Sequence, residues 1–427
     1  MCKIISGWKE KTLSTGGKEV LLKSIAQAIP SYAMSVFKIP KQTCKGITDA
    51  MAHYWWGDDA DRKRMHWFSW WKMCVPKKNG GMGFRDIQCF NLALLAKQVW
   101  RLVEYPESLC ARVLRARYFP TGDLLNAELK KGSSFTWQSM FSGIKTLKLG
   151  HIWRVGDGNT IDIWTDEWIP NCVSRKVITR RGQNLLSKVC DLIDPATNQW
   201  DEDLIRQTFW PIDQQRILSI PLPTFGMSDF MAWSLTKTGI FSVRSAYHAE
   251  WQAWFGQRLN HGREQGMMNP HPIWDRIWSL QVPAKIKIFL WRTMHGTIPC
   301  RAILADRHIK VSGQCPVCSA GAEDIKHLLF LCPRAKSVWK CLGLDLRVDE
   351  ACQVDRAGPA VYDFLLFSNR SPARCLGHNH RLKYLPLPVG IYGGRDVRQF
   401  MVSKYKLQSG LPWRSLFLCQ IIKLHIR

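Results

Sequence analysis

Four residues between Cys315 and Cys332 have the types and the spacing of a metal site. In the stretch CPVCSAGAEDIKHLLFLC, Cys315 and Cys318 are separated by two residues, so a tight turn can aim both sulfurs at one point. His327 and Cys332 follow on an expected helix, from Asp324 onward, and complete a tetrahedron of three thiolates and one imidazole. Zinc prefers this ligand set, and four protein ligands leave no position for a substrate water. We therefore expect one structural Zn²⁺.

Other interpretations of these residues stay open at the level of sequence. Cys315 and Cys318 could be buried free thiols, with His327 on a helix surface. Cys300 or Cys341 could replace one ligand, although both lie farther along the chain from the group. A CPxC turn with a downstream His and Cys is a fairly specific pattern, and it favours the metal site.

The charge balance indicates a polyanionic partner. The chain has 60 Lys and Arg against 34 Asp and Glu, a formal net charge of +26, and a field of that sign attracts nucleic acid. Its 21 Trp could stack on unpaired bases, but we expect most of them in the core. For each candidate contact, a merely solvated charge is the alternative. The candidate contacts with RNA or single-stranded DNA are Arg62, Lys63, Arg64, Lys77, Lys78, Lys285, Arg292, Arg301, Arg307 and Lys310.

Cysteine usage and hydropathy indicate a soluble protein of a reducing compartment. The 15 cysteines form no regular framework, and the N-terminus MCKIISGWKEK lacks an apolar signal-peptide region. No apolar run approaches the length needed to span a bilayer. We expect an intracellular location, in the nucleus or the cytoplasm, without a membrane partner.

Residues 1–120 read as helices separated by Gly and Pro. Residues 18–29 have helical periodicity and end before Pro30. Residues 91–103 repeat apolar side chains at helical spacing, and Asn91 is the predicted N-cap.

Two β-hairpins are predicted after residue 150. In the first, HIWRV and TIDIW flank the turn GDGN, and in the second, DFMAWSLTKTGIFSV turns near Thr238 and Gly239. Ser242 is then the expected cap of a short helix through Tyr247, and residues 257–270 are an expected loop. In PAKIKIFLWRTMHG, Ile288 and Trp291 fall outside the apolar helical stripe, and we expect them to pack on a neighbouring element rather than offer a surface to a base.

These patterns predict an α+β protein, predominantly helical, with short β-hairpins, a small structural zinc domain and a poorly ordered tail. Residues 1–120 form a helical, Trp-rich region and residues 121–235 a mixed connector with a β-hairpin. Residues 236–345 form the zinc-binding domain. Residues 346–427 form a divergent basic tail, expected to be disordered because it has little clean periodicity and many Gly and Pro.

The chain closely resembles the zinc-binding domain on the C-terminal side of plant non-LTR (LINE-type) retrotransposon reverse transcriptases. That resemblance is carried by IWSLQVPAKIKIFLWRTMHGTIPCRAILADRHI, CPVC and AEDIKHLLFLCPRAKSVW. Upstream, GWKEKTLSTGGKEVLLKSIAQAIPSYAMSVFKIP, PKKNGGMGFRDIQCFNLALLAKQVWRL and WRVGDGNTIDIW resemble the region that follows the polymerase palm in that family. The resemblance covers roughly residues 6–345, and it implies that residues 1–120 follow a palm that this chain lacks.

No catalytic residues are predicted. A reverse transcriptase needs palm carboxylates that share two Mg²⁺ ions with the nucleotide, and YWWGDD (Tyr54–Asp59) fails the required spacing. Asp162, Asp166 and Glu167 form one acidic cluster, and WDEDLIR another, but neither comes with the rest of a ribonuclease H site. The acids of WDEDLIR suit a helix N-terminus.

We therefore expect a catalytically inactive fragment of an RNA-directed DNA polymerase that binds RNA template or target DNA. Two alternatives stay open: a protein-docking or structural zinc module that binds no nucleic acid, and an accessory part of an active polymerase. A retroelement polymerase or ribonucleoprotein complex is the expected protein partner. The expected cofactor is the single Zn²⁺.

Overall fold

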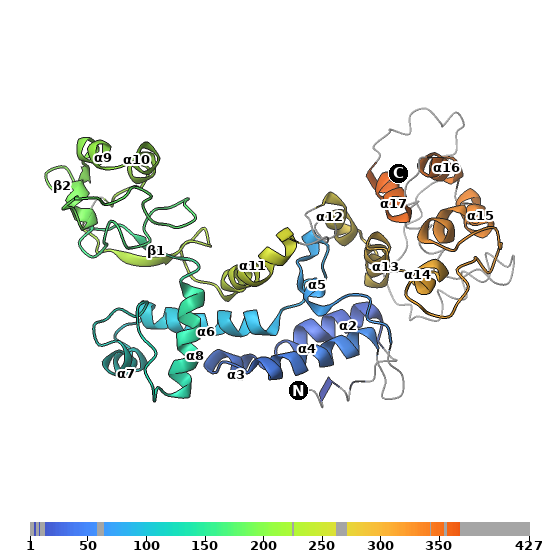
Figure 1. The fold of residues 1–427 in the computed structure, drawn as a ribbon, viewed down its shortest axis with the longest axis horizontal. Helices are drawn as coiled ribbons and strands as arrows, with labels where there is room; N and C mark the ends of the chain where they lie inside the picture. The colour runs from blue at the N-terminus through green and yellow to red at the C-terminus, as the bar shows by residue number, and fades with distance from the viewer. Residues whose placement is uncertain are drawn as a thin grey trace, which may run out of the picture. The chain divides into compact units, whose positions relative to one another are not determined.

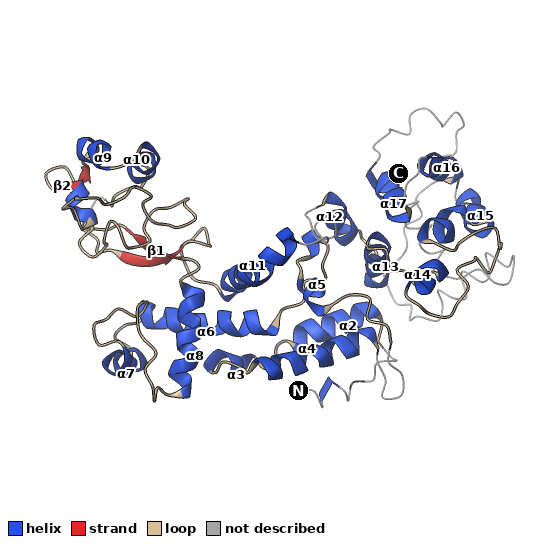
Figure 2. Cartoon of the chain, viewed as in Figure 1, coloured by secondary structure: helices blue, strands red, loops and turns tan. Residues whose placement is uncertain are grey.

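The computed structural model describes residues 4–5, 8, 13–57, 64–223, 226–261, 271–341, 343–353 and 357–367 (Figure 1). Helices dominate these residues, with a few short strand pairs (Figure 2), so the α+β, predominantly helical prediction is confirmed. The chain divides into two compact units: unit 1 comprises residues 1–13, 17–74 and 83–266, and unit 2 comprises residues 14–16, 75–82 and 267–427. Within the described parts, no helix is both long and apolar enough to cross a bilayer.

Unit 1 is built around a long helix, α6 (Ile87–Glu104), which packs against α3, α8 and α11. Asp86 caps α6, because its Oδ1 accepts a hydrogen bond from the Cys89 N–H at 2.9 Å. The other helical elements that lie wholly or mostly in unit 1, outside the segment between β1 and β4, are α2 (Thr15–Leu21), the π-helix η2 (Leu22–Ala26), α3 (Ser31–Val36), α4 (Lys41–Trp56), α5 (Trp70–Cys74), α7 (Leu109–Tyr118), α8 (Phe135–Leu147) and α11 (Val243–His261).

Asn91 does not cap α6. It is a buried residue within the helix, and its side chain forms hydrogen bonds to the α3 segment. Its Nδ2 donates to the carbonyl oxygens of Met34 and Phe37 at 2.7 and 2.9 Å, and its Oδ1 accepts from the Ile39 N–H at 2.8 Å. The predicted cap was wrong because these partners come from the α3 segment, more than 50 residues away in sequence. Asn91 thereby satisfies the backbone groups at the C-terminal end of α3.

The two predicted hairpins contribute one strand each to a single ribbon. β1 (His151–Arg154) pairs antiparallel with β4 (Phe230–Trp233), so that Arg154 lies opposite Phe230. The predicted turn near Gly239 is present, with φ of 74° at Gly239, but β4 is not followed by a second strand. Ser242 caps the following helix as expected, and that helix, α11, extends to His261, which is farther than predicted.

A loop-rich lobe lies between β1 and β4. Its elements are the 3-10 helix η4 (Val189–Leu192), β2 (Ile193–Asp194), β3 (Gln199–Trp200), α9 (Glu202–Thr208) and α10 (Pro211–Leu218), and β2 and β3 form a short hairpin. Its core is a cluster of buried apolar side chains that includes Ile161, Ile163, Trp168 and Ile205. Much of the backbone here is irregular, so side chains must satisfy it.

Unit 2 is helical. Its elements are the 3-10 helix η3 (Lys77–Asn79), α12 (Pro272–Ser279), α13 (Ala284–Met294), α14 (Arg301–Asp306), the π-helix η5 (His327–Leu331), α15 (Pro333–Cys341), α16 (Asp345–Gln353) and α17 (Gly358–Phe367). Ile288 and Trp291 are both buried, which agrees with the expectation that they pack on neighbouring elements.

Helices α16 and α17 occupy residues that the sequence had placed in the basic tail. Val361, Tyr362 and Leu365 of α17 are buried, so the apolar run GPAVYDFLLF folds onto unit 2. Residues 368–427 of the predicted tail lie outside the described residues.

Large aromatic side chains fill the cores of both units. Trp137, Trp168, Trp233 and Trp291 are almost completely buried. This burial fits the interpretation of the abundant Trp as core residues, whose large apolar area stabilises the fold.

Candidate metal centre

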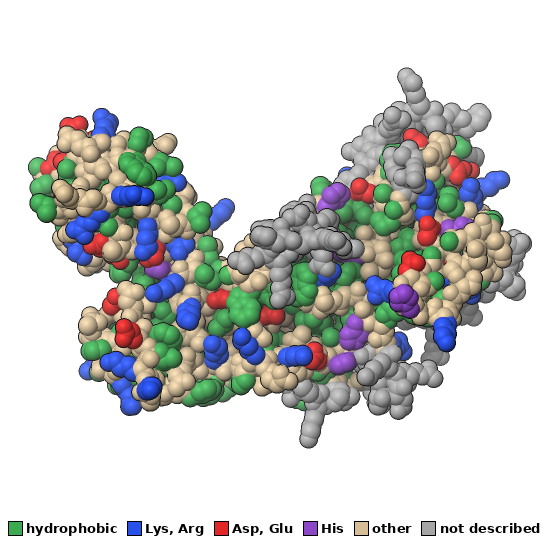
Figure 3. Space-filling model, viewed as in Figure 1, with side chains coloured by type: hydrophobic (Ala, Val, Ile, Leu, Met, Phe, Trp, Pro, Cys, Tyr) green, Lys and Arg blue, Asp and Glu red, His purple; other side chains and the backbone are tan. Residues whose placement is uncertain are grey.

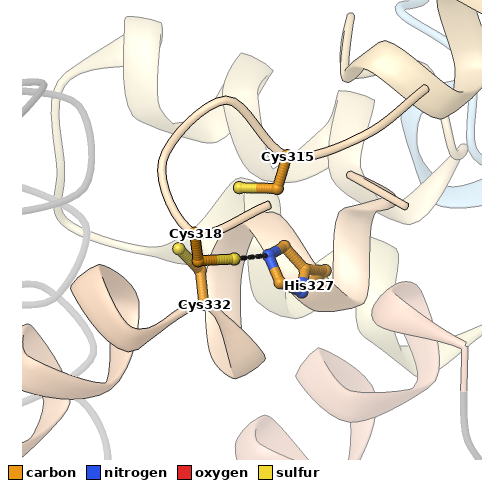
Figure 4. A group of neighbouring side chains, drawn as sticks. All are labelled: Cys315, Cys318, His327 and Cys332. Atoms are coloured by element: carbon orange, nitrogen blue, oxygen red, sulfur yellow. Dashed lines mark hydrogen bonds between the residues drawn. The ribbon is translucent and has the colours of Figure 1, made fainter. Parts of the chain in front are cut away.

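The structure brings Cys315, Cys318, His327 and Cys332 together in unit 2. Their side chains converge on one point (Figure 4), and all their ligand atoms lie within 4.8 Å of one another. Cys318 Sγ and His327 Nε2 are 3.2 Å apart. Among the described residues, this is the one group of His, Cys, Asp and Glu side chains with such geometry.

A tight turn positions the first two thiols. The Ser319 N–H donates to the Cys315 carbonyl at 3.0 Å, and the Cys315 N–H donates to the Gly321 carbonyl at 2.9 Å. Ser319 has φ of 54°, the left-handed conformation that reverses the chain after Cys318. The turn therefore points both sulfurs inward, as the CPxC spacing predicted.

A π-helical turn positions the other two ligands. The Cys332 N–H donates to the His327 carbonyl at 2.9 Å, which closes the wider turn of η5. In a regular α-helix, residues five apart would lie about 140° from each other around the axis. The wider π-turn reduces this angle and lets the His327 ring and the Cys332 sulfur face the same point. The sequence predicted a helix here but gave no sign of this irregularity.

The surroundings shift the pKa values of two of the thiols in opposite directions. Burial raises the pKa of Cys315, but hydrogen bonds from the backbone N–H groups of Cys318 and Val317 and from the His327 side chain outweigh it and lower that pKa to about 7. Burial raises the pKa of Cys332, and the adjacent Cys315 raises it further. A cation at the centre would stabilise the thiolate form of every sulfur.

The donor set fits Zn²⁺. Tetrahedral Zn–S and Zn–N bonds of about 2.3 and 2.0 Å require ligand atoms roughly 3.5 to 3.8 Å apart, and small side-chain shifts within this group achieve that. Three thiolates and one imidazole would fill the coordination sphere and leave no site for water. The metal would therefore act as a cross-link between the CPVC turn and the η5–α15 segment.

Apolar packing supports the ligand segment from behind. Phe330 is completely buried, stacks on Trp339 with ring centroids 5.8 Å apart, and contacts the Tyr362 ring edge to face at 4.9 Å. Trp339 Nε1 donates to the Leu329 carbonyl at 2.8 Å. These contacts anchor η5 to α15 and α17 and so fix where His327 points.

The segment Val75–Met82 belongs to unit 2, although it lies far from the rest of that unit in sequence. The Gly80 carbonyl accepts a hydrogen bond from Trp291 Nε1 at 2.7 Å and lies 2.6 Å from His295 Nε2. Lys77 Nζ lies 4.1 Å from the centre of the Trp278 ring. Sequence reasoning missed this docking, and its signal was the unusual run PKKNGG, which suits a tight turn.

The candidate nucleic-acid contacts occupy different environments. Lys78, Arg307 and Lys310 are exposed, as are Arg64 and Lys285. Lys77, Arg292 and Arg301 are half-buried, and Arg292 Nη2 donates to the Thr297 carbonyl at 2.8 Å. Arg62 and Lys63 lie outside the described residues. Figure 3 shows Lys and Arg side chains scattered over the visible surface rather than gathered in one patch. The candidate nucleic-acid contacts therefore stay predictions.

The acidic clusters are engaged in structural contacts. Asp162 Oδ1 accepts from the N–H groups of Trp164 and Thr165, and Asp166 accepts from the Asp162 N–H. Glu167 contacts His151 at 2.9 Å and Lys176 at 3.3 Å. Asp201 caps α9, as the helix N-terminus interpretation predicted. In YWWGDD, α4 ends at Trp56, and the two aspartates lie outside the described residues.

Neither alternative thiol joins the metal group. Cys300 is buried at the start of α14, and Cys341 is exposed at the end of α15. Both are free cysteines outside the four-residue cluster.

Comparison with known proteins supports the resemblance drawn from the motifs. Residues 241–339 match the family model of the zinc-binding domain in reverse transcriptase. The chain is 30% identical over 347 residues to an Arabidopsis thaliana protein named "Putative ribonuclease H protein", covering 78% of this chain and 53% of the relative. The chain thus spans about half the length of that relative.

A second relative is covered almost completely. An uncharacterized mitochondrial protein of Arabidopsis thaliana is 40% identical over 143 residues, which is 33% of this chain and 93% of the relative.

The match to the zinc-binding family model includes all four residues of the metal group. The chain therefore belongs to the family of retrotransposon-type proteins that carry the zinc-binding domain of reverse transcriptases.

Proposed function

We propose that this protein is a non-catalytic part of a plant non-LTR (LINE-type) reverse transcriptase and that it binds nucleic acid, either RNA template or target DNA. The observation that carries the proposal is the closed metal group in a unit with exposed cationic side chains. Its four ligands leave no position for a reacting group. Lys78, Lys285, Arg307 and Lys310 are exposed in the same unit, where they can reach phosphates.

The absence of chemistry is part of the proposal. Among the described residues, the carboxylates that could suggest a nuclease site are turned to backbone N–H groups, to a cap or to ion pairs. Two-metal chemistry needs carboxylates that share two cations, and these contacts give the acidic clusters a structural role that supports the proposal.

The test compares the full chain with Cys315→Ser and His327→Ala. Bound zinc is measured by elemental analysis, and the affinity for a fluorescent single-stranded RNA is measured at two salt concentrations. We expect one zinc per wild-type chain, less zinc in both variants, and RNA binding that weakens steeply with salt, because phosphate contacts release counterions. Cys341→Ser, which removes an exposed thiol outside the group, is the matched control.

A protein-docking module is the second candidate. Apolar side chains near the CPVC turn favour it: Val317 is 52% exposed, and Ile309 and Val311 are each 38% exposed. A docking module would keep its zinc and show no salt-sensitive RNA affinity. That result would move the function from nucleic acid to protein binding.

A further inference from the structure

A half-open cavity of about 480 Å³ lies in unit 1 beside the β1–β4 ribbon. We call it the ribbon cavity. Its walls come from the last turns of α6, with Trp100 and Glu104, from the end of the ribbon, with Arg154 and Phe230, and from the turn that holds Lys237. Its volume falls within the range of about 300 to 1,000 Å³ typical of small-ligand sites. None of these residues was singled out by the sequence motifs.

An uncovered aromatic ring forms one wall of the ribbon cavity. Phe230 is 49% exposed at the first position of β4, and Ile240 on the following turn is 64% exposed. Trp100, another lining residue, is buried and stacks on Phe241 with ring centroids 5.6 Å apart. The cavity therefore offers the exposed Phe230 ring to a planar group, beside an aromatic side chain held by packing.

Two cationic side chains stand beside this ring. Arg154 lies directly opposite Phe230 in the ribbon, and directly opposed residues of an antiparallel pair share one face. Arg154 and Lys237 are both exposed, and neither takes part in an ion pair with a described residue. Glu104 is the one carboxylate among the lining residues. The cavity thus combines a stacking surface with two available positive charges.

The backbone around the ribbon cavity is held in place. The Trp233 N–H donates to the Gly239 carbonyl at 2.7 Å, and Thr236 Oγ1 donates to the Ile240 carbonyl at 2.8 Å, which fixes the turn that carries Lys237. Asp229, next to Phe230, accepts hydrogen bonds from the N–H groups of Gly156 and Gly158 at 2.7 and 2.9 Å. Such support limits the ordering cost of binding.

We propose that the ribbon cavity binds one unpaired nucleotide of a single-stranded nucleic acid. The base stacks on Phe230, and the adjoining phosphate lies between Arg154 and Lys237. Stacking on an aromatic ring beside cationic side chains is how proteins hold single strands without reading sequence. The inference rests on the proposed function, which placed the nucleic-acid contacts elsewhere, and adds a site in unit 1. A duplex cannot use it, because paired bases do not expose their faces.

The test uses the full chain and fluorescent 12-nucleotide RNA and DNA single strands of one sequence, with the RNA duplex as a third probe. We expect Phe230→Leu to weaken single-strand binding about fivefold or more, the loss that follows from one stacked base, and to leave duplex binding unchanged. We expect the double variant Arg154→Gln, Lys237→Gln to lower the salt slope by about 0.7 for each lost phosphate contact. Melting curves confirm that each variant folds.

Matched controls remove the same groups outside the cavity. Tyr32→Leu removes a ring that is 84% exposed, and the double variant Lys130→Gln, Lys131→Gln removes two exposed charges. A measurement without any variant adds a check: RNA that contains 4-thiouridine should form photocrosslinks to residues 230–240.

The outcomes separate this inference from the proposed function. Weaker binding in the cavity variants alone, with crosslinks to residues 230–240, supports the site. Wild-type binding that is salt-sensitive, while cavity and control variants bind equally well, overturns the cavity and leaves the proposed function standing. No binding of RNA or DNA by the wild type overturns both.

Discussion

The metal group of unit 2 and the loop-rich lobe of unit 1 both contain turns outside regular helices and strands, and different contacts hold those turns in place. In the lobe, carboxylates accept several backbone N–H groups each, and an apolar core lies beneath them. In unit 2, four side chains converge on one metal position. The first solution distributes stability over many contacts, and the second concentrates it in one ion.

The largest expected difference between these regions appears on removal of metal. Structural Zn²⁺ sites contribute apparent binding free energies of about 10 to 16 kcal/mol. We therefore expect chelation to make the amides of residues 313–332 exchange rapidly with solvent, while those of residues 161–192 keep their protection. Hydrogen exchange of the full chain with and without a zinc chelator measures this. Equal loss of protection in both regions would show that the lobe depends on the metal as much as the metal group does.

Removal of one buried carboxylate should produce an intermediate effect in the lobe. Asp213 is fully buried, and its Oδ2 accepts from the N–H groups of Ile178 and Thr179 at 2.8 and 2.7 Å and from Thr179 Oγ1 at 2.7 Å. Asp213→Ala leaves these donors without a partner and should lower the free energy of unfolding by about 3 kcal/mol. Urea denaturation measures the change.

The control for Asp213 is an exposed carboxylate of the same lobe. Glu202 pairs with Arg206 at 2.5 Å, and each side chain is 59% exposed. Glu202→Ala should change the free energy of unfolding by less than about 0.5 kcal/mol, because solvent screens such pairs. If the two substitutions lower the free energy of unfolding by the same amount, burial of the carboxylate does not determine how much it stabilises the fold.

A smaller, pH-dependent effect is expected at Asp229. Burial raises its pKa, but hydrogen bonds from Gly156, Thr160 and Gly158 outweigh burial and lower it. A carboxyl whose pKa is lower in the folded state stabilises the fold above its unfolded pKa of about 3.9, and this contribution is lost as pH falls through the folded value. Asp229→Asn should therefore lower the free energy of unfolding by about 1 to 2 kcal/mol at neutral pH.

That difference should shrink as pH falls below about 4, because the unfolded chain then binds a proton at this carboxyl that the folded chain does not yet bind. Urea denaturation of both proteins at pH 7 and pH 3 measures it, and the other carboxylates cancel in the comparison. A difference that stays constant with pH would mean that the charge of Asp229 does not stabilise the turn.

The two regions also differ in how far sequence predicted them. The metal group was predictable because its ligands lie within 18 residues and their types define the chemistry. The ribbon that flanks the lobe was not, because its pairing is distant: β1 pairs with β4 rather than with TIDIW next to it. Local alternation located β1 and β4, but it could not choose the partner strand, and TIDIW forms only an isolated bridge at Asp162 instead of the predicted strand.

Long-range contacts explain the other differences. Asn91 resembles a cap until the α3 segment supplies its partners. The ribbon cavity combines α6, β1, β4 and a turn, and no local pattern marks those residues together. Helix existence and the metal ligands depend on neighbours in sequence, whereas caps, strand pairs and cavities depend on tertiary contacts.

The docking of Val75–Met82 on unit 2 makes that unit discontinuous along the chain. Excision of residues 241–339 alone would remove Gly80, the acceptor of the Trp291 indole N–H and a contact of His295. The buried indole would lose its hydrogen bond, and the surface beneath η3 would face water. A minimal protein that preserves this unit would need the PKKNGG segment rejoined to it, through a linker or as a separate peptide added in trans.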